Sequence, residues 1–203
     1  MGPRVDVLRQ SPPLFTNRVL DSLTRTPPVV LPVVWLPVIT TLVLIRFNQL
    51  AVGVCLLLFA LGWGLWTLTE YGLHRWLFHW QPSGRRGQRL HFVIHGVHHE
   101  HPSDPLRVVF PPVMGIPIAA VFFVMFRFLF GEHAWPLVAA GFIAGYLVFD
   151  LVHAYMHTGK VRNGLGRYLR ARHLRHHFRD DTKNFGVSSP LWDLILLTES
   201  RRR

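Results

Sequence analysis

Long apolar runs alternate with short polar segments along this 203-residue chain, and that pattern predicts a helical membrane protein. Four runs, at residues 29–45, 50–69, 113–130 and 135–152, are each about 17–20 residues long, enough to span a bilayer core of about 30 Å as an α-helix. We therefore expect an all-α integral membrane fold with about four transmembrane helices arranged as two hairpins. Pro32 and Pro37 fall in the first run, which is also compatible with a kinked or re-entrant segment.

The polar segments between and after the hairpins predict a helical cap at one end of the bundle. The second run continues through Glu70 toward His79 without a helix breaker after Gly72. Short helices are expected at 89–99 and 168–178, with loops at 81–87 and 159–166 where glycine, proline and serine gather. The predicted domains are a polar N-terminal arm (1–28) and a membrane domain (29–203).

Basic residues set the expected orientation in the membrane. The chain carries 22 Lys and Arg against 11 Asp and Glu, a formal charge of +11. They crowd the arm and the segment from 160 to 203, whereas the turns after the first and third runs have few. By the positive-inside rule both termini and the cap should be cytoplasmic. The charge fits membrane lipids and an acidic redox partner, and no recognition fold for nucleic acid accompanies it.

The first 28 residues contain five prolines and no apolar core of a signal peptide, so the first run is expected to be a retained anchor. Cys55 is the only cysteine and lies within the second run. It cannot form an internal disulfide or hold an iron–sulfur cluster, and we expect it to serve in packing.

Ten of the 13 histidines fall into four tight clusters. Two clusters have the spacing HxxHH, one has HxxxxH and one has HxxxH. On a helix, positions i, i+3 and i+4 share a face, so each HxxHH is expected to direct three imidazoles to one spot. Because ten imidazoles exceed what one ion accepts, the clusters suit a pair of ions. The residues are His74, His79, His95, His98, His99, His153, His157, His173, His176 and His177.

The residue types narrow the chemistry. No thiolates are available for structural zinc. No acidic residue lies within the clusters, whereas two-metal hydrolases commonly use carboxylate ligands. Bis-histidine haem would leave most of the histidines unexplained. Nitrogen ligands suit redox iron better than magnesium or calcium. Asp150 and Glu70 precede His153 and His74 on the same helix faces, so either could orient a ligand or be an ordinary helix-end residue.

Four stretches together resemble the membrane fatty acid hydroxylase superfamily, and within it the fatty acid 2-hydroxylases. They are HRWLFH (74–79), LHFVIHGVHHEHPSDPLRVVFPP (90–112), DLVHAYMHTG (150–159) and ARHLRHHFRDDTKNFGVSSPLWD (171–193). A single HxxHH motif is weak evidence for a family, but four histidine clusters in this order are specific evidence. The resemblance extends from the second run to Trp192.

The resemblance implies a non-haem di-iron oxygenase that inserts one atom of O2 into an acyl chain, at carbon 2 in the nearest relatives. It assigns the ten histidines as ligands of two iron ions, a site that zinc can occupy after purification. Asn184 could help to order the last cluster or be a turn residue, and His91 is a possible orienting residue, although a structural role is favoured. His101 and His133 lie outside the motifs and are expected at solvent or an interface.

The chain lacks the cytochrome b5 domain that many relatives carry, so electrons are expected from a separate carrier, such as cytochrome b5 or ferredoxin with its reductase. Three alternatives remain open. Two use the same kind of centre: an acyl-chain desaturase, and a sterol or carotenoid hydroxylase. The third is a non-enzymatic membrane metal-binding protein, which would be expected to place ligands along the spans rather than at one face.

Overall fold

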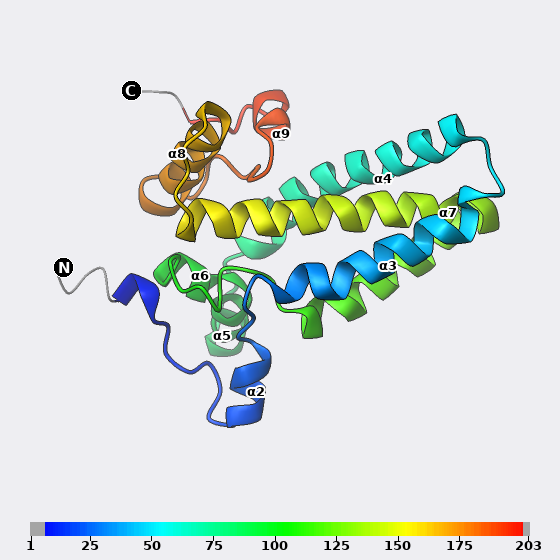
Figure 1. Cartoon of the computed structure of the whole chain (residues 1–203). Helices are drawn as coiled ribbons and strands as arrows, with labels where there is room; N and C mark the ends of the chain where they lie inside the picture. The colour runs from blue at the N-terminus through cyan, green and yellow to red at the C-terminus, as the bar shows by residue number, and fades with distance from the viewer. Residues whose placement is uncertain (1–6, 201–203) are drawn as a thin grey trace.

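The computed structural model describes residues 7–200, and every regular element within that range is a helix. Three long helices form a bundle: α3 (Val30–Phe47), α4 (Val52–Gly72) and α7 (Pro112–Thr158) (Figure 1). In the described part of the chain these are the helices long and apolar enough to cross a membrane, when α4 is extended as far as Phe78. The prediction of an all-helical membrane fold is confirmed.

Helix α7 is two antiparallel arms rather than one rod of 47 residues. At Gly131 the backbone has φ 69° and ψ 175°, which lies outside the helical region and suits glycine. Phe122 and Phe142, on opposite sides of this break, have ring centroids 4.6 Å apart. The chain therefore reverses at Gly131, and the bundle contains four apolar rods, as the two predicted hairpins require.

Glycines allow α4 to approach the second arm of α7 closely. A Cβ on Gly62 would lie 1.9 Å from the backbone oxygen of Val138, and one on Gly141 would lie 1.9 Å from that of Phe59. Small residues permit such backbone contact between membrane helices. Trp66 packs edge-on against Tyr146 beside this contact, with ring centroids 5.2 Å apart.

The bundle exposes apolar side chains on its outer surface, including Leu57 and Phe128. In water such a surface would be unfavourable, whereas lipid solvates it. Pro37 lies inside α3, which runs without interruption, so the helical reading of the first run is confirmed. Cys55 is buried, as a packing residue should be.

The cap is built from the end of α4 and from short helices. Element α4 continues as the π-helix η1 (Leu73–Phe78), and the segment that follows comprises α5 (Arg85–His91), the π-helix η2 (Phe92–Gly96) and α6 (Val97–Glu100). After α7 come α8 (Gly164–Phe178) and α9 (Leu191–Ile195). The predicted loop 159–166 was wrong at its end: α8 begins at Gly164 because Asn163 caps it, its side chain accepting from the Gly166 N–H.

The N-terminal arm packs onto the cap and includes α2 (Arg18–Leu23). Arg107 donates to Asp21 at 2.7 Å, and Ser11 donates to Asp104 at 2.6 Å. Leu14 is buried. These contacts make the described part of the arm an integral side of the cap rather than a free polar extension.

Candidate metal centre

The spacing of the first cluster is explained by the π-helix η1. The His79 N–H donates to the backbone oxygen of His74 at 3.2 Å, a bond from i+5 to i. This wider turn brings residues five apart onto one side of the helix, and the two imidazole centroids lie 5.1 Å apart. Short π-helical segments of this kind are frequent at functional sites.

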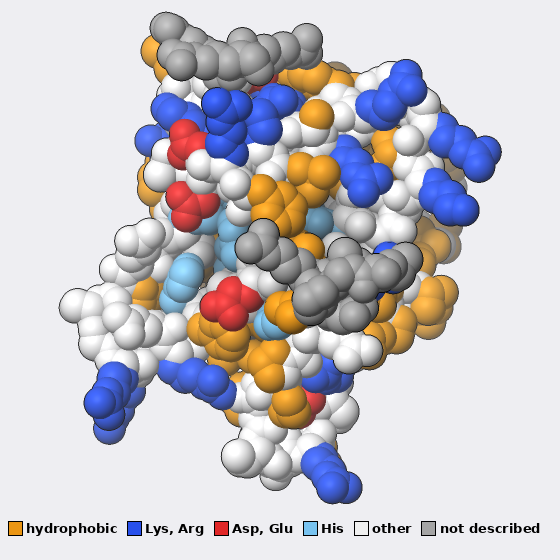
Figure 2. Space-filling model, turned by 90° about the vertical axis from the view of Figure 1, so that its left-hand side faces the viewer, with side chains coloured by type: hydrophobic (Ala, Val, Ile, Leu, Met, Phe, Trp, Pro, Cys, Tyr) orange, Lys and Arg blue, Asp and Glu red, His pale blue; other side chains and the backbone are white. Residues whose placement is uncertain are grey.

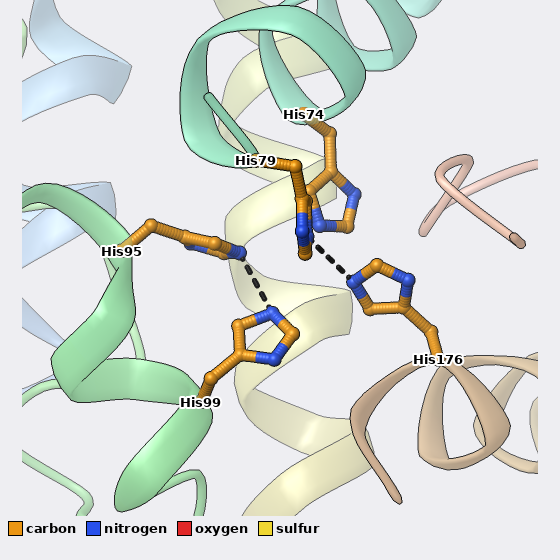
Figure 3. Close-up of side chains that lie close together, drawn as sticks. All are labelled: His74, His79, His95, His99 and His176. Carbon is orange, nitrogen blue, oxygen red and sulfur yellow. Dashed lines mark hydrogen bonds between the residues drawn. The ribbon is translucent and has the colours of Figure 1, made fainter. Parts of the chain in front are cut away.

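The structure brings all ten clustered histidines together in two adjacent groups of five. Within each group the nearest ring nitrogens all lie within 4.8 Å of one another. The two groups adjoin, since the rings of His99 and His177 are 4.2 Å apart. The first histidine group is His74, His79, His95, His99 and His176, shown in Figure 3, and the second is His98, His153, His157, His173 and His177.

Each HxxHH motif is divided between the two groups, so the expectation that its three imidazoles meet at one spot was wrong. His95 and His99 belong to the first group, but His98 belongs to the second. Adjacent residues on a helix differ by about 100° in direction, and here His98 and His99 point to different groups. In the last motif His173 and His177 join the second group, and His176 crosses to the first.

Nitrogen spacings in the first group suit ligands of a shared ion. The Nε2 atoms of His79 and His176 are 2.9 Å apart, and those of His95 and His99 are 3.0 Å apart. Two imidazole nitrogens bound at 2.0–2.1 Å to one ion, at right angles, would be about 3 Å apart. The Nε2 of His74 is buried without a hydrogen-bond partner in the described structure, as expected for a lone pair that needs a metal.

Ring nitrogens in the second group are spaced in the same way. The Nε2 of His173 lies 2.7 Å from the Nε2 of His157 and 3.0 Å from the Nε2 of His177. The Nε2 atoms of His177 and His98 are 3.1 Å apart. His153 hydrogen-bonds to the backbone of Val108. Its Nε2 is buried without a partner among the described residues. The donor atoms of both groups therefore fit metal ions that bind nitrogen ligands.

Backbone carbonyls orient two ligands of the first group. The Nδ1–H of His74 donates to the oxygen of Phe185 at 2.5 Å, and that of His176 donates to the oxygen of Lys183 at 2.7 Å. A proton held on Nδ1 leaves the Nε2 lone pair free for a metal. Between these two carbonyls lies Asn184, whose φ of 57° is in the left-handed region that asparagine tolerates.

Asn184 and Glu70 both hold this loop in place. Asn184 donates to the hydroxyl of Ser200 at 2.8 Å and accepts from its N–H at 3.0 Å. Glu70 accepts from the N–H groups of Val187 and Ser188, each at 2.8 Å, and from the Ser188 hydroxyl. Both side chains bind the loop that carries the Phe185 and Lys183 carbonyls, so their influence on His74 and His176 runs through the loop backbone.

The remaining candidates lie in supporting positions. Asp150 is buried and accepts from the Phe110 N–H at 3.1 Å, which holds the chain close to His153 through Val108. His91 bonds to the backbone oxygen of Phe78 at 2.8 Å and so ties α5 to η1.

The two histidines outside the motifs differ in their surroundings. His133 is exposed, as expected. The expectation for His101 was wrong, because it is buried with its Nδ1 2.5 Å from the oxygen of Val7. The arm covers this residue, a contact that no local pattern reveals.

Burial keeps the cap imidazoles neutral. Burial, with the neighbouring imidazoles of His176 and His91, lowers the pKa of His79 to about 3. Burial, with His176 and His79, lowers the pKa of His99 to about 2. Neutral imidazole is the form that binds a metal, so this site holds its ligands ready for metal binding.

A cavity of about 340 Å³ leads from the histidines into the bundle. His74 and His95 of the first group and His98 and His153 of the second line one part of it. Apolar side chains from the bundle, such as Phe122, line another part. This volume lies within the range of small-molecule sites. Figure 2 shows the cap face, where histidine side chains are visible near the middle and Lys and Arg side chains are spread around them.

Sequence reasoning missed three contributors to the site. The carbonyls of Lys183 and Phe185 carry no side-chain signal, because any residue supplies a backbone oxygen. Asp181, whose carboxylate lies 4.0 Å from the Nδ1 of His79, also went unnoticed. The only available signal was their position in the DDTKNFG stretch directly after the last histidine cluster.

Fold and site together define a helical membrane protein whose paired histidine groups could hold metal ions at one end of an apolar cavity. A family model described as fatty acid hydroxylase matches residues 59–198, which include all ten clustered histidines. The chain belongs to the fatty acid hydroxylase family.

Curated relatives agree with this assignment. The chain is 35% identical to a dihydroceramide fatty acyl 2-hydroxylase of Arabidopsis thaliana, over 93% of this chain and 80% of the relative. It is 33% identical to the fatty acid 2-hydroxylase of Rattus norvegicus, over 91% of this chain but only 56% of the relative. The chain therefore spans little more than half the length of the mammalian protein.

A solved structure shares the fold. The hydroxylase domain of full-length scs7p superposes with a TM-score of 0.85 at 35% identity, over 92% of this chain and 71% of that one. The fold and the resemblance to fatty acid 2-hydroxylases are thus confirmed, and they support a hydroxylating enzyme of lipid metabolism.

Proposed function

We propose that the protein holds two iron ions, one in each histidine group, and uses O2 to hydroxylate a lipid acyl chain at carbon 2. The observation that carries this proposal is the meeting of two five-histidine groups beside a largely apolar cavity. Relatives named as 2-hydroxylases of fatty acyl chains support the choice of substrate and carbon. When bound, iron would supply the activation of O2 that an unactivated C–H bond requires.

The chain's own residues would bind and orient the reactants. The ten clustered histidines serve as the ligands, and the carbonyls of Phe185 and Lys183 fix two of them. Glu70 and Asn184 position the loop that carries these carbonyls. Asp150 supports the chain beside His153, and His91 has a structural role between α5 and η1. Apolar cavity walls would hold the acyl chain and keep bulk water from the site.

The reaction needs electrons as well as O2. One oxygen atom enters the C–H bond to give an alcohol, and the other leaves as water after taking up two electrons and two protons. A separate carrier, such as cytochrome b5 or ferredoxin with its reductase, would supply them. Exposed Arg162, Arg167 and Arg179 lie on the cap, so docking of an acidic carrier should weaken as salt rises.

The proposed placement puts the cap and both termini in the cytoplasm. The apolar rods of the membrane domain (29–203) cross the bilayer, and the described part of the arm (1–28) lies on the cap. The excess of arginine in the arm and after residue 160 supports this orientation. Reporter fusions at the two termini would test it, and a reporter active only on the far side of the membrane would contradict it.

Comparative lipid mass spectrometry tests the reaction. Cells that express the wild type should gain lipid species heavier by one oxygen, with fragmentation placing it on carbon 2, and cells with His98→Ala or His176→Ala should not. His133→Ala is the matched control because this histidine is exposed and outside both groups. Species lighter by two hydrogens would indicate a desaturase instead. Metal bound by the purified wild type, without any lipid product, would favour a metal-binding protein.

A further inference from the structure

A cluster of exposed apolar side chains lies at and just after α9, outside the four apolar rods. The exposed fraction is 47% for Leu191, 55% for Leu194, 56% for Ile195, 42% for Leu196 and 83% for Leu197. A compact patch of this kind on the cap is unfavourable in water and marks a contact surface. The proposed reaction does not use these residues.

Helix α9 lies against a membrane-crossing helix rather than on the outer side of the cap. The indole N–H of Trp192 donates to the hydroxyl of Thr67 at 3.1 Å. Thr67 belongs to α4, within the apolar helix that runs from Val52 to Phe78. Figure 1 shows α9 on the bundle side of α8, beside the cap end of α4.

The length of that helix gives the depth of the contact. Its 27 residues extend for about 40 Å, whereas a bilayer core of about 30 Å needs about 20 of them. Counted from Val52, the core would reach about Tyr71, which places Thr67 about 6 Å below its edge. Trp76, an exposed indole further along the helix, lies where the interfacial belt of tryptophans is expected.

We propose that residues 191–197 are embedded in the membrane beside α4, with their exposed side chains in the acyl region of the leaflet next to the cap. The occupant of this surface is lipid, because the segment meets α4 at Thr67, next to Leu68 of the apolar helix, which is 43% exposed. Apolar segments that lie at a bilayer surface are buried by about 5–10 Å, which agrees with the depth of Thr67. Hydropathy alone does not reveal the segment, since it is far too short to span.

The proposed membrane-embedded segment, residues 191–197, adjoins the loop that orients the first histidine group. Asp193, within α9, accepts from the N–H of Phe185 at 2.9 Å and from that of Gly186 at 2.7 Å. It also accepts from Arg172 of α8 at 2.8 Å. The membrane-embedded segment thus holds the loop whose Phe185 carbonyl meets His74.

Spin labels in lipid vesicles test the proposal. In a Cys55→Ala background, Leu194→Cys or Leu197→Cys would carry a nitroxide, and Arg179→Cys, exposed on the cap, is the matched aqueous control. In vesicles of phosphatidylcholine, relaxation by O2 relative to relaxation by a water-soluble nickel chelate should be several-fold larger at 194 and 197 than at 179.

Equal ratios at the three positions, in protein of normal helical content, would overturn the proposal. Two labelled positions in the patch ensure that failure of one variant to fold leaves the other informative. The measurement involves neither metal nor substrate, so its outcome is independent of the proposed reaction and depends only on α4 crossing the membrane.

Discussion

The Nδ1 of His74 lies 2.5 Å from the backbone oxygen of Phe185, a residue 111 positions further along the chain. His74 ends the first hairpin, whereas Phe185 follows the last histidine cluster. The bond fixes which nitrogen of His74 is free for a metal. The geometry of the first histidine group therefore depends on how the two halves of the molecule pack.

Removing the carboxylate of Glu70 should loosen that arrangement. Glu70→Leu leaves the N–H groups of Val187 and Ser188 without their acceptor. Metal affinity should therefore fall by about 10–100-fold, as for other residues that orient ligands. Glu70→Gln should retain most of the affinity, because its amide oxygen can still accept from both N–H groups. Metal content after dialysis against a chelator measures the effect. Glu132→Leu, at an exposed ion pair with Arg127, is the control and should match the wild type.

The division of HxxHH between two groups predicts an unusual pattern in double variants. His98→Ala with His153→Ala removes two ligands from the second group only, so about one ion should remain per chain. His98→Ala with His99→Ala alters neighbours in the sequence but damages both groups, and both ions should be depleted. Metal analysis of the purified proteins, with circular dichroism to verify folding, distinguishes the two. Equal metal content in both would contradict the division.

Filling the cavity at Gly115 should shift the preference toward shorter acyl chains. Gly115 lines the cavity, and a Cβ there would lie 3.3 Å from the ring of Trp35 and 3.5 Å from the Tyr146 hydroxyl. A leucine therefore has to extend into the cavity. Product analysis by chain length checks the prediction. Gly64→Leu is the matched control, since a Cβ at Gly64 meets nothing within 4 Å, and an unchanged profile for Gly115→Leu would place the acyl chain elsewhere.

A buried ion pair behind the cap should matter for stability. Arg172 contacts Asp193 at 2.8 Å and Glu199 at 2.5 Å, and both Arg172 and Asp193 are almost completely buried. Arg172→Met leaves Asp193 and Glu199 without their cationic partner, and such losses typically destabilise a protein by about 3–5 kcal/mol. Arg127→Met, at an exposed pair, should cost less than about 1 kcal/mol. Unfolding by denaturant in detergent compares them, and similar midpoints would argue against the role of the buried pair.

Acidification should destabilise the metal-free protein before it protonates the site. Burial lowers the pKa of His79 to about 3 and of His99 to about 2 in the folded state, against about 6.5 in the unfolded chain. The stability these groups contribute is present above about pH 6.5 and is lost as the pH falls below it, because only the unfolded chain then binds protons. Thermal unfolding after chelation, compared at about pH 7.5 and about pH 5.5, measures the loss. Equal melting temperatures would show that the imidazoles are not buried as described.

Much of the fold follows from local sequence. The four apolar runs form the four rods, and the chain reverses at Gly131, in the turn expected between the third and fourth runs. The end of α4 was predicted to continue into the histidines, as it does through η1. These features depend on the period and length of apolar segments and on the preference of glycine for positive φ, all of which are local properties. The motif text likewise identified the ten histidines and the family.

Tertiary structure decided how those histidines are shared. Sequence spacing treats each motif as a unit, but in the packed cap His98 joins the second histidine group and His99 the first. The burial of His101 under the arm and the contact of Trp192 with Thr67 join segments that are distant in the chain. The amino-acid sequence thus determined which side chains are present and which helices form. Packing between helices decided which side chains meet, because a contact across 100 residues depends on the relative placement of whole elements and has no local pattern.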